Sequence, residues 1–283
     1  MRILSIQSSV AYGHVGNSAA VFPLQRMGHE VMPVFTVVFS NHTGYGSWKG
    51  PLLSGQNVRD VVAGIDERGG LDDVELVLSG YQGGDDIGDA ILDAVALVKE
   101  RNPGAVYACD PVLGSADSGC FVAPEVQHLI RDRVVPRADL ITPNQFELGF
   151  ITGTSPLTLD ETLESVELAR AQGPGSVLVT SVLRPDRPEG TIEMLAVTPD
   201  GAWIVQTPQL PFKANGSGDV TAALFSSQLR ATGDPGAALA RTAASVFELL
   251  ENTLESGDRE LRLVESQEAY VNPRRAFEVE RIR

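Results

Sequence analysis

A short glycine-rich segment, Asn215-Gly216-Ser217-Gly218-Asp219, has the residue types needed to act on a phosphate group. Glycines let the backbone turn sharply and bring bare N–H groups close to a ligand. A helix is predicted from Gly218 to Thr232, and its positive end favours an anion at the same place. A carboxylate at Asp219 is suited to take a proton from an attacking hydroxyl, which is worth about 10²–10⁴ in rate. From these residues alone, a glycine turn in which Asp219 only caps the helix remains the alternative.

The elements that must position this segment follow an alternating pattern along the chain. Short apolar runs alternate with longer stretches of helical periodicity, which predicts parallel strands buried on both faces of a doubly wound α/β sheet. The predicted strands are Ile3–Ile6, Val31–Phe39, Val74–Leu78, Ala105–Cys109, Ala138–Ile141 and Ser176–Ser181. The predicted helices are Val58–Arg68, Ile87–Arg101, Ala123–Arg133 and Leu159–Ala171. In such sheets the ligand lies beyond the carboxyl ends of the strands, so the site is expected there.

The pattern changes after residue 181. Thr191–Thr198 and Ala202–Thr207 flank the turn signal Pro199-Asp200-Gly201 and are predicted to form an antiparallel hairpin. A last helix is predicted from Pro235 to Thr253, with Asp234 as its N-cap and a proline at its first position. Because no internal repeat or low-complexity linker interrupts the sequence, residues 1–283 are predicted to form a single domain.

The overall charge narrows the class of partners. The chain has 22 basic and 37 acidic residues, a net charge of −15, which opposes non-specific binding to nucleic acid or anionic lipid. Cys109 and Cys120 have no disulfide or metal-ligand spacing, and no apolar run is long enough for a signal peptide or a membrane span. A cytoplasmic protein without nucleic-acid or membrane partners is therefore expected.

Several motifs together resemble one enzyme family. Gly216-Ser217-Gly218-Asp219 resembles the GxGD signature of the ribokinase superfamily. Five further segments resemble motifs of its pyridoxal kinase branch, in the same order, and the likeness runs from residue 3 to about residue 250. These segments are Ile6-Gln7-Ser8-Ser9-Val10-Ala11-Tyr12-Gly13-His14-Val15-Gly16-Asn17, Phe39-Ser40-Asn41-His42-Thr43-Gly44-Tyr45-Gly46, Ser79-Gly80-Tyr81-Gln82-Gly83, Cys109-Asp110-Pro111-Val112-Leu113-Gly114 and Thr142-Pro143-Asn144-Gln145-Phe146-Glu147-Leu148.

The resemblance implies a fold and a reaction. The fold is the ribokinase-like three-layer α/β fold, with a central, mostly parallel sheet between helices and a small antiparallel hairpin. The reaction is ATP- and Mg²⁺-dependent phosphorylation of the 5′-hydroxymethyl group of pyridoxal, in a homodimeric enzyme. Two alternatives stay open: a kinase of the same fold acting on hydroxymethylpyrimidine or another small molecule, and a non-catalytic vitamin B6-binding protein.

Residue roles follow from the same resemblance. Asp219 would be the catalytic base, and the amides of Gly216, Ser217 and Gly218 would form the anion hole. On the vitamin side, Ser8 would bond the pyridine nitrogen. Thr43, with His42 near by, would contact the side of the ring that carries the hydroxyl group. Tyr81 would lie against the ring, whose apolar walls would be Val15, Val37 and Phe39.

On the nucleotide side, Asp110 and Glu147 would organise Mg²⁺, directly or through water. Thr142 and Thr180 would lie near the ATP phosphates, and Thr207, Pro208, Gln209 and Leu210 beside the base or ribose. From the residues alone, Asp110 and Glu147 are equally explained as a turn residue and a first-turn acid.

The sequence also departs from the family pattern. Ser9 replaces the bulkier polar residue of many relatives, and Thr180 stands where bacterial pyridoxal kinases commonly place a lysine against the phosphates. The chain has only three lysines, so we predict that Arg184 or Arg187, in a proline-rich loop, closes over the phosphates instead.

Overall fold

The central sheet grows from strands whose side chains are apolar on both faces. A computed structural model describes residues 1–283, and nine strands form one sheet in the order β11-β10-β9-β8-β7-β4-β3-β1-β2. The parallel part of the sheet contains β1 (Arg2–Tyr12), β2 (Glu30–Asn41), β3 (Val74–Ser79), β4 (Val106–Cys109), β7 (Leu140–Ile141) and β8 (Ser176–Val182). All six predicted strands are therefore present.

The predicted hairpin is also confirmed. β9 (Thr191–Thr198) and β10 (Gly201–Pro208) pair antiparallel across the turn, and β9 also pairs antiparallel with β8. The hairpin thus extends the main sheet, and β11 (Val279–Arg281) adds one further antiparallel edge strand. A separate two-stranded antiparallel sheet, β5 (Gly114–Ser115) with β6 (Gly119–Cys120), was not predicted.

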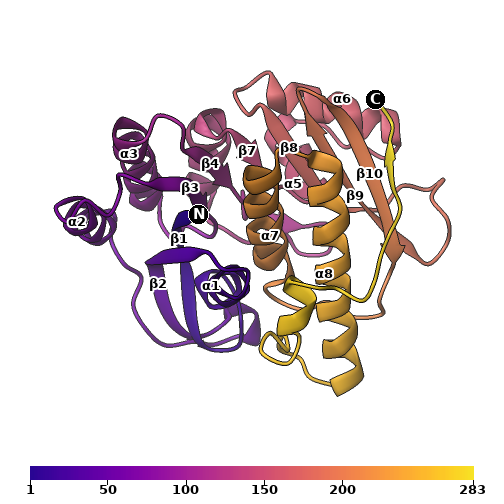
Figure 1. The fold of residues 1–283 in the computed structure, drawn as a ribbon, viewed down its shortest axis with the longest axis horizontal. Helices are drawn as coiled ribbons and strands as arrows, with labels where there is room; N and C mark the ends of the chain where they lie inside the picture. The colour runs from indigo at the N-terminus through magenta and orange to yellow at the C-terminus, as the bar shows by residue number, and fades with distance from the viewer.

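Helices cover both faces of the sheet and make three layers (Figure 1). One face packs against α2 (Gly55–Asp66), α3 (Asp85–Arg101), α4 (Pro124–Leu129), α5 (Gln145–Thr152) and α6 (Leu159–Arg170). The other packs against α1 (Asn17–Arg26), α7 (Ser217–Thr232) and α8 (Pro235–Ser256), which lie side by side. The expectation of a three-layer, mostly parallel α/β fold is confirmed.

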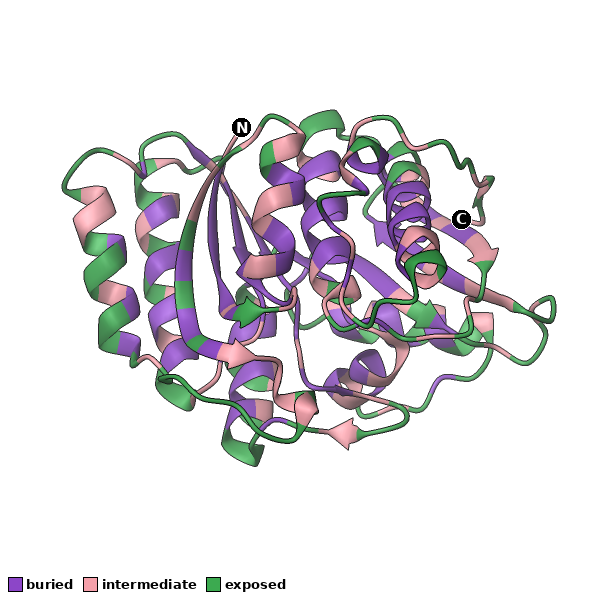
Figure 2. Ribbon diagram, turned by 90° about the horizontal axis from the view of Figure 1, so that it is seen from below, coloured by how far each residue is buried: buried purple, intermediate pink, exposed green.

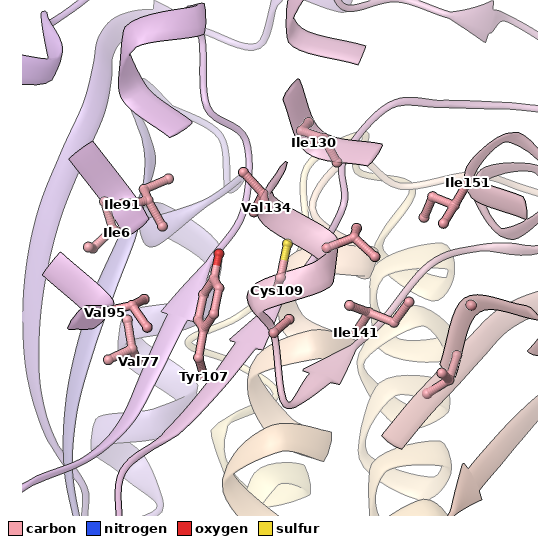
Figure 3. Packing of buried hydrophobic residues seen from close by; sticks show 14 of the residues in the cluster. Ile6, Val77, Ile91, Val95, Tyr107, Cys109, Ile130, Val134, Ile141 and Ile151 are labelled. Atoms are coloured by element: carbon pink, nitrogen blue, oxygen red, sulfur yellow. The ribbon is translucent and has the colours of Figure 1, made fainter. Parts of the chain in front are cut away.

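Burial explains this layering. Successive residues of β1 point to opposite layers: Leu4 and Ile6 join the larger core, and Ile3 joins the smaller one. In the larger core, the strand residues Val77, Tyr107 and Ile141 meet α3 and the segment after α4 (Figure 3). The central strands and the inward faces of the helices are buried (Figure 2).

One helix prediction needs correction, and two helices were missed. The helix expected over Ala123–Arg133 ends earlier: α4 stops at Leu129 and continues as one π-helical turn, Ile130–Val134. Helices α1 and α5 were not predicted. Three single 3₁₀ turns complete the chain: Thr43–Tyr45, Val135–Arg137 and Gln267–Tyr270. No helix of the protein has the length and apolar content needed to cross a lipid bilayer.

Candidate active site

A cavity of about 1730 Å³ lies at the carboxyl-end side of the parallel strands. Apart from Arg184 and Arg187, every residue to which the sequence assigned a site role lines it. They are Ser8, Val15, Val37, Phe39, His42, Thr43, Tyr81, Asp110, Thr142, Glu147, Thr180, Thr207, Pro208, Gln209, Leu210, Gly216, Ser217, Gly218 and Asp219. The site thus gathers segments from both ends of the chain.

The N-terminus of α7 lines this cavity. The helix begins at Ser217, and Gly216 precedes it with a left-handed backbone, φ 86°. A side chain at Gly216 would place its Cβ only 1.8 Å from the carbonyl oxygen of His14, so the β1–α1 loop leaves room for glycine alone. The arrangement provides bare N–H groups and a helix dipole for an anion.

Asp219 lies in the first turn of α7 and is half-buried. Burial raises the pKa of its carboxyl to about 6, while hydrogen bonds from the backbone N–H groups of Gly16 and of Asp219 itself oppose the rise. A carboxylate with a pKa near neutrality is a suitable proton acceptor for a hydroxyl. The backbone N–H of Gly16 therefore helps to hold the Asp219 carboxylate at the cavity.

Two further acids, both buried, lie near Asp219. Asp110, 7 % exposed, accepts a hydrogen bond of 2.9 Å from the Thr142 hydroxyl. Burial raises the pKa of Asp110 well above its usual range, and the charges of Glu147 and Asp219 raise it further. Three carboxylates without a basic partner create negative charge that a cation would offset.

Glu147 has a structural task of its own. One carboxylate oxygen accepts the N–H groups of Leu113 and Gly114, at 2.9 and 3.2 Å. The other accepts the N–H of Asn144 at 2.9 Å and completes a capping box at the start of α5. Burial raises the pKa of Glu147 to about 7, against these bonds. The first-turn interpretation is thus observed, and the same side chain still lines the cavity.

The number of acidic side chains that lie together limits how the predicted Mg²⁺ could be held. The chain contains no group of three or more His, Cys, Asp or Glu residues arranged to hold a metal by themselves. Mg²⁺ usually keeps several waters and binds through one or two carboxylates and the phosphates of a nucleotide, so Asp110 fits such an ion. Because both oxygens of Glu147 already accept amide hydrogens, this residue fits an indirect role through water.

An apolar wall forms the opposite end of the cavity. Val15, Val37 and Phe39 make a small buried cluster against which Tyr81 packs, and Ser8 lies beside it, 5 % exposed. A flat aromatic ligand needs such a wall together with a few directed polar groups.

The 3₁₀ turn at Thr43 provides polar groups at this end. His42 caps the turn, because its ring nitrogen Nδ1 accepts the N–H of Gly44 at 3.1 Å, and burial lowers its pKa. The ring of His14 instead contacts the carbonyl oxygen of Ser18 at 3.2 Å. Of the two histidines, only His42 lines the cavity.

The far end of the cavity is lined by the residues after β10 and by the end of β8. Thr180 bridges to Asn144, and its N–H bonds the carbonyl oxygen of Pro143 at 2.9 Å. Ser181 has φ 54°, the only positive value outside glycine in the chain. A β-bulge between Val179 and Val182 accompanies this unusual backbone, which turns the strand end at the cavity wall.

The two arginines proposed for the phosphates lie elsewhere, so that prediction is wrong for this structure. Neither Arg184 nor Arg187 lines the cavity. Arg184 forms a two-pronged ion pair with buried Glu193, at 2.7 and 2.9 Å, and Arg187 bonds backbone carbonyl groups of its own loop. Lys213 is the only lysine or arginine lining the cavity, and it forms an ion pair with Asp117.

Sequence reasoning missed three contributors to the site. Gly16 acts through its backbone N–H, which leaves no side-chain signature. Asn144 caps α5 and also donates to the carbonyl oxygen of Gly114 at 2.8 Å. Its spacing of three from Glu147 was the available sign of a capping box. Lys213 lies two residues ahead of the glycine-rich segment and could have been found as the lysine nearest to it.

The three-layer fold, with a Gly-x-Gly-Asp segment opening a buried helix at the cavity, defines a ribokinase-like small-molecule kinase. The family model described as phosphomethylpyrimidine kinase matches residues 87–263. The chain is 69 % identical to a pyridoxal kinase PdxY of Leifsonia xyli over 282 residues, and 59 % identical to one of Corynebacterium diphtheriae over 282 residues. Both alignments cover 100 % of each chain.

Solved structures give the same result. A pyridoxal kinase from Leishmania donovani in complex with ADP and pyridoxamine superposes with a TM-score of 0.92 at 29 % identity, covering 100 % of this chain and 99 % of that one. The Trypanosoma brucei pyridoxal kinase superposes with a TM-score of 0.87 at 29 % identity, covering 99 % of each. The chain belongs to the pyridoxal kinase family.

Proposed function

We propose that the chain transfers the γ-phosphoryl group of ATP to the 5′-hydroxymethyl group of pyridoxal, with Asp219 as the general base. Family membership supports the reaction, because full-length relatives are named pyridoxal kinases. The observation that carries the assignment is the shared cavity: Asp219 and Gly216–Gly218 line the same cavity as the apolar wall and the segment Thr207–Leu210.

The geometry accounts for the transfer as in-line displacement. The alcohol oxygen attacks the γ-phosphorus as its proton passes to the Asp219 carboxylate, and the bond to the β-phosphate oxygen breaks, leaving ADP. The amides of Gly216, Ser217 and Gly218, together with the α7 dipole, stabilise charge on the transferring group. The proximity of the groups and fixed electrostatics provide most of the rate enhancement.

The test is Asp219→Asn. We expect turnover with pyridoxal and ATP to fall by about 10²–10⁴, with binding of both substrates retained. The matched control is Asp234→Asn, at the N-cap of the next helix, where asparagine caps equally well and the residue does not line the cavity. An Asp219→Asn enzyme within threefold of the wild type would refute the assignment of the base.

One observation favours a second substrate. The matching family model carries the description phosphomethylpyrimidine kinase, and a pyrimidine with a hydroxymethyl group has a ring of similar size. Turnover measured side by side with pyridoxal, pyridoxine, hydroxymethylpyrimidine and ribose separates these possibilities. A higher kcat/KM for the pyrimidine than for pyridoxal would replace the proposed substrate.

For the metal, we propose that Asp110, with Glu147 acting through water, helps to hold Mg²⁺ near the nucleotide phosphates. When bound, the ion would neutralise phosphate charge. Support comes from three carboxylates that have no basic partner, Asp110 and Glu147, which are buried, and Asp219, which is half-buried. The check is activity after removal of divalent ions with EDTA and re-addition of Mg²⁺. Asp110→Asn should raise the Mg²⁺ concentration needed for half-maximal activity; an unchanged requirement would argue against this role.

A cytoplasmic homodimer completes the proposal. Both cysteines are free, which agrees with a reducing compartment. The edge strand β2 exposes Phe35 and Val38, and Leu52 in the segment paired with this strand is 59 % exposed. Such an apolar edge is the kind of surface that a second copy covers. Light scattering should give twice the chain mass for the wild type and less for Val38→Glu; a monomeric wild type would contradict the proposal.

A further inference from the structure

Glu260 lies in the loop after α8 and has no role in the reaction described above. Its two carboxylate oxygens connect two loops that are distant in the sequence. Oε2 accepts the backbone N–H of His14 in the β1–α1 loop at 3.1 Å. Oε1 accepts the hydroxyl of Tyr45, in the 3₁₀ turn after β2, at 2.5 Å. A single side chain from the C-terminal part of the chain therefore joins both loops, beside the end of the cavity proposed to bind pyridoxal.

The β1–α1 loop held by Glu260 contacts the reacting groups directly. The carbonyl oxygen of His14 is packed against Gly216, so closely that a Cβ there would approach it to 1.8 Å. Two residues later, the N–H of Gly16 bonds the Asp219 carboxylate. Gly16 also lies against Ser8, because a Cβ on it would be 2.3 Å from the serine Oγ. A displacement of this loop would therefore move the base, the anion hole and the ring-binding serine together.

The second loop carries the polar groups assigned to the vitamin ring. The turn Thr43–Tyr45 contains Thr43, and His42 caps it. Arg259, next to Glu260, stacks over the Tyr45 ring at 5.3 Å, which adds a cation–π contact. The hydrogen bond to Glu260 also raises the pKa of the Tyr45 hydroxyl to about 12, so the phenol stays protonated and able to donate.

The fit around Glu260 is tight on the loop side. Gly13 has φ 87°, and a Cβ on it would lie 2.2 Å from the Glu260 carboxylate. The loop therefore has a glycine, which has no side chain, at the point where the Glu260 carboxylate approaches it. We propose that Glu260 is a positioning residue: it holds the β1–α1 loop and the Thr43–Tyr45 turn in register, and so sets the pyridoxal end of the site. This inference rests on the proposed function.

The test compares three variants with pyridoxal and ATP as substrates. Glu260→Ala loses both bonds, and we expect the KM for pyridoxal to rise about tenfold while the KM for ATP stays within twofold. Glu260→Gln should restore most of the loss, because its carbonyl oxygen accepts from His14 and its amide donates to the Tyr45 oxygen. Tyr45→Phe should have an effect in the wild type and none in Glu260→Ala, since both variants remove the same bond.

A second readout does not depend on activity. Hydrogen exchange of the peptide containing residues 12–18 should be faster in Glu260→Ala than in the wild type, with Glu260→Gln close to the wild type. The matched control is Glu255→Ala, an exposed glutamate at the end of α8. It should change neither the KM for pyridoxal nor the exchange.

The outcomes separate the inference from the function on which it rests. A wild type that does not phosphorylate pyridoxal would refute the proposed function and the inference with it. An active wild type whose Glu260→Ala variant keeps the KM for pyridoxal, or raises the KM for ATP equally, would refute the inference alone. Failure of Glu260→Gln to rescue would likewise overturn it, because glutamine can still hydrogen-bond both His14 and Tyr45 and should therefore hold both loops.

Discussion

Replacing Gly216 by alanine tests the closest contact in the site. The added Cβ would lie 1.8 Å from the carbonyl oxygen of His14, whereas carbon and oxygen need about 3.3 Å. The β1–α1 loop or the start of α7 must therefore move by about 1.5 Å. A displacement of about 1 Å at reacting groups costs about 10²-fold in rate, so we expect kcat to fall at least that much. The left-handed backbone adds about 1–2 kcal/mol of strain to the folded state.

The same helix supplies the matched control. Gly233 ends α7 with φ 66°, and a Cβ there would meet nothing within 4 Å. Gly233→Ala therefore carries the backbone strain without the collision. Coupled detection of ADP release would give kcat, and thermal unfolding would give Tm. Both variants should lose Tm, Gly216→Ala more because it adds the collision to the strain, and only Gly216→Ala should lose kcat. Equal kcat values for the two variants would show that the close approach of His14 does not matter for transfer.

The remaining predictions concern charge. First, kcat/KM should fall about tenfold per pH unit below about pH 6, as Asp219 becomes protonated, and the residual rate of Asp219→Asn should lack this acid limb. Second, burial raises the pKa of Asp219 above its unfolded value, so the folded state binds the proton more tightly and this residue costs stability as pH rises through about 4 to 6. Asp219→Asn should accordingly have a higher Tm than the wild type at pH 8 and a smaller advantage at pH 4; the opposite order would contradict the burial argument. Third, Arg184→Ala should lower stability by about 3 kcal/mol, because it leaves the carboxylate of Glu193, 2 % exposed, without its partner. Fourth, Lys213→Ala should raise the KM for ATP and Arg187→Ala should not. The reverse result would indicate that Arg187, and not Lys213, contacts the ATP phosphates.

Most of the sheet was predictable because burial on both faces leaves continuous apolar runs. Strands such as Val74–Ser79 have that pattern, and so does the hairpin around Gly201. Helix α1 was missed because Pro23 lies inside it and its apolar content is spread around the axis. The π-helical turn after α4 was missed because Ile130–Val134 continue the periodicity of an ordinary helix.

In the site, too, residues with a distinctive side chain could be predicted from the sequence, and residues that act through the backbone could not. Residues predicted from a distinctive side chain within a short motif, such as Asp219 and Tyr81, line one cavity. Residues that act through the backbone, such as Gly16, leave no trace in residue type. The contact between His14 and Glu260 spans 246 positions, so no local pattern predicts it. Thr180 was noted as a departure from the family pattern, and the compensation was sought in Arg184, which instead pairs with Glu193 nine residues further along the chain.

The bond between His14 and Glu260 also bears on how the protein is made. During synthesis the β1–α1 loop leaves the ribosome early. The helix that carries Asp219 is made much later, and so is Glu260, whose carboxylate fastens the loop. Premature termination products therefore contain the vitamin-contacting strand without the means of phosphoryl transfer. The hydrogen bond that fastens the β1–α1 loop can form only after residue 260 has left the exit tunnel.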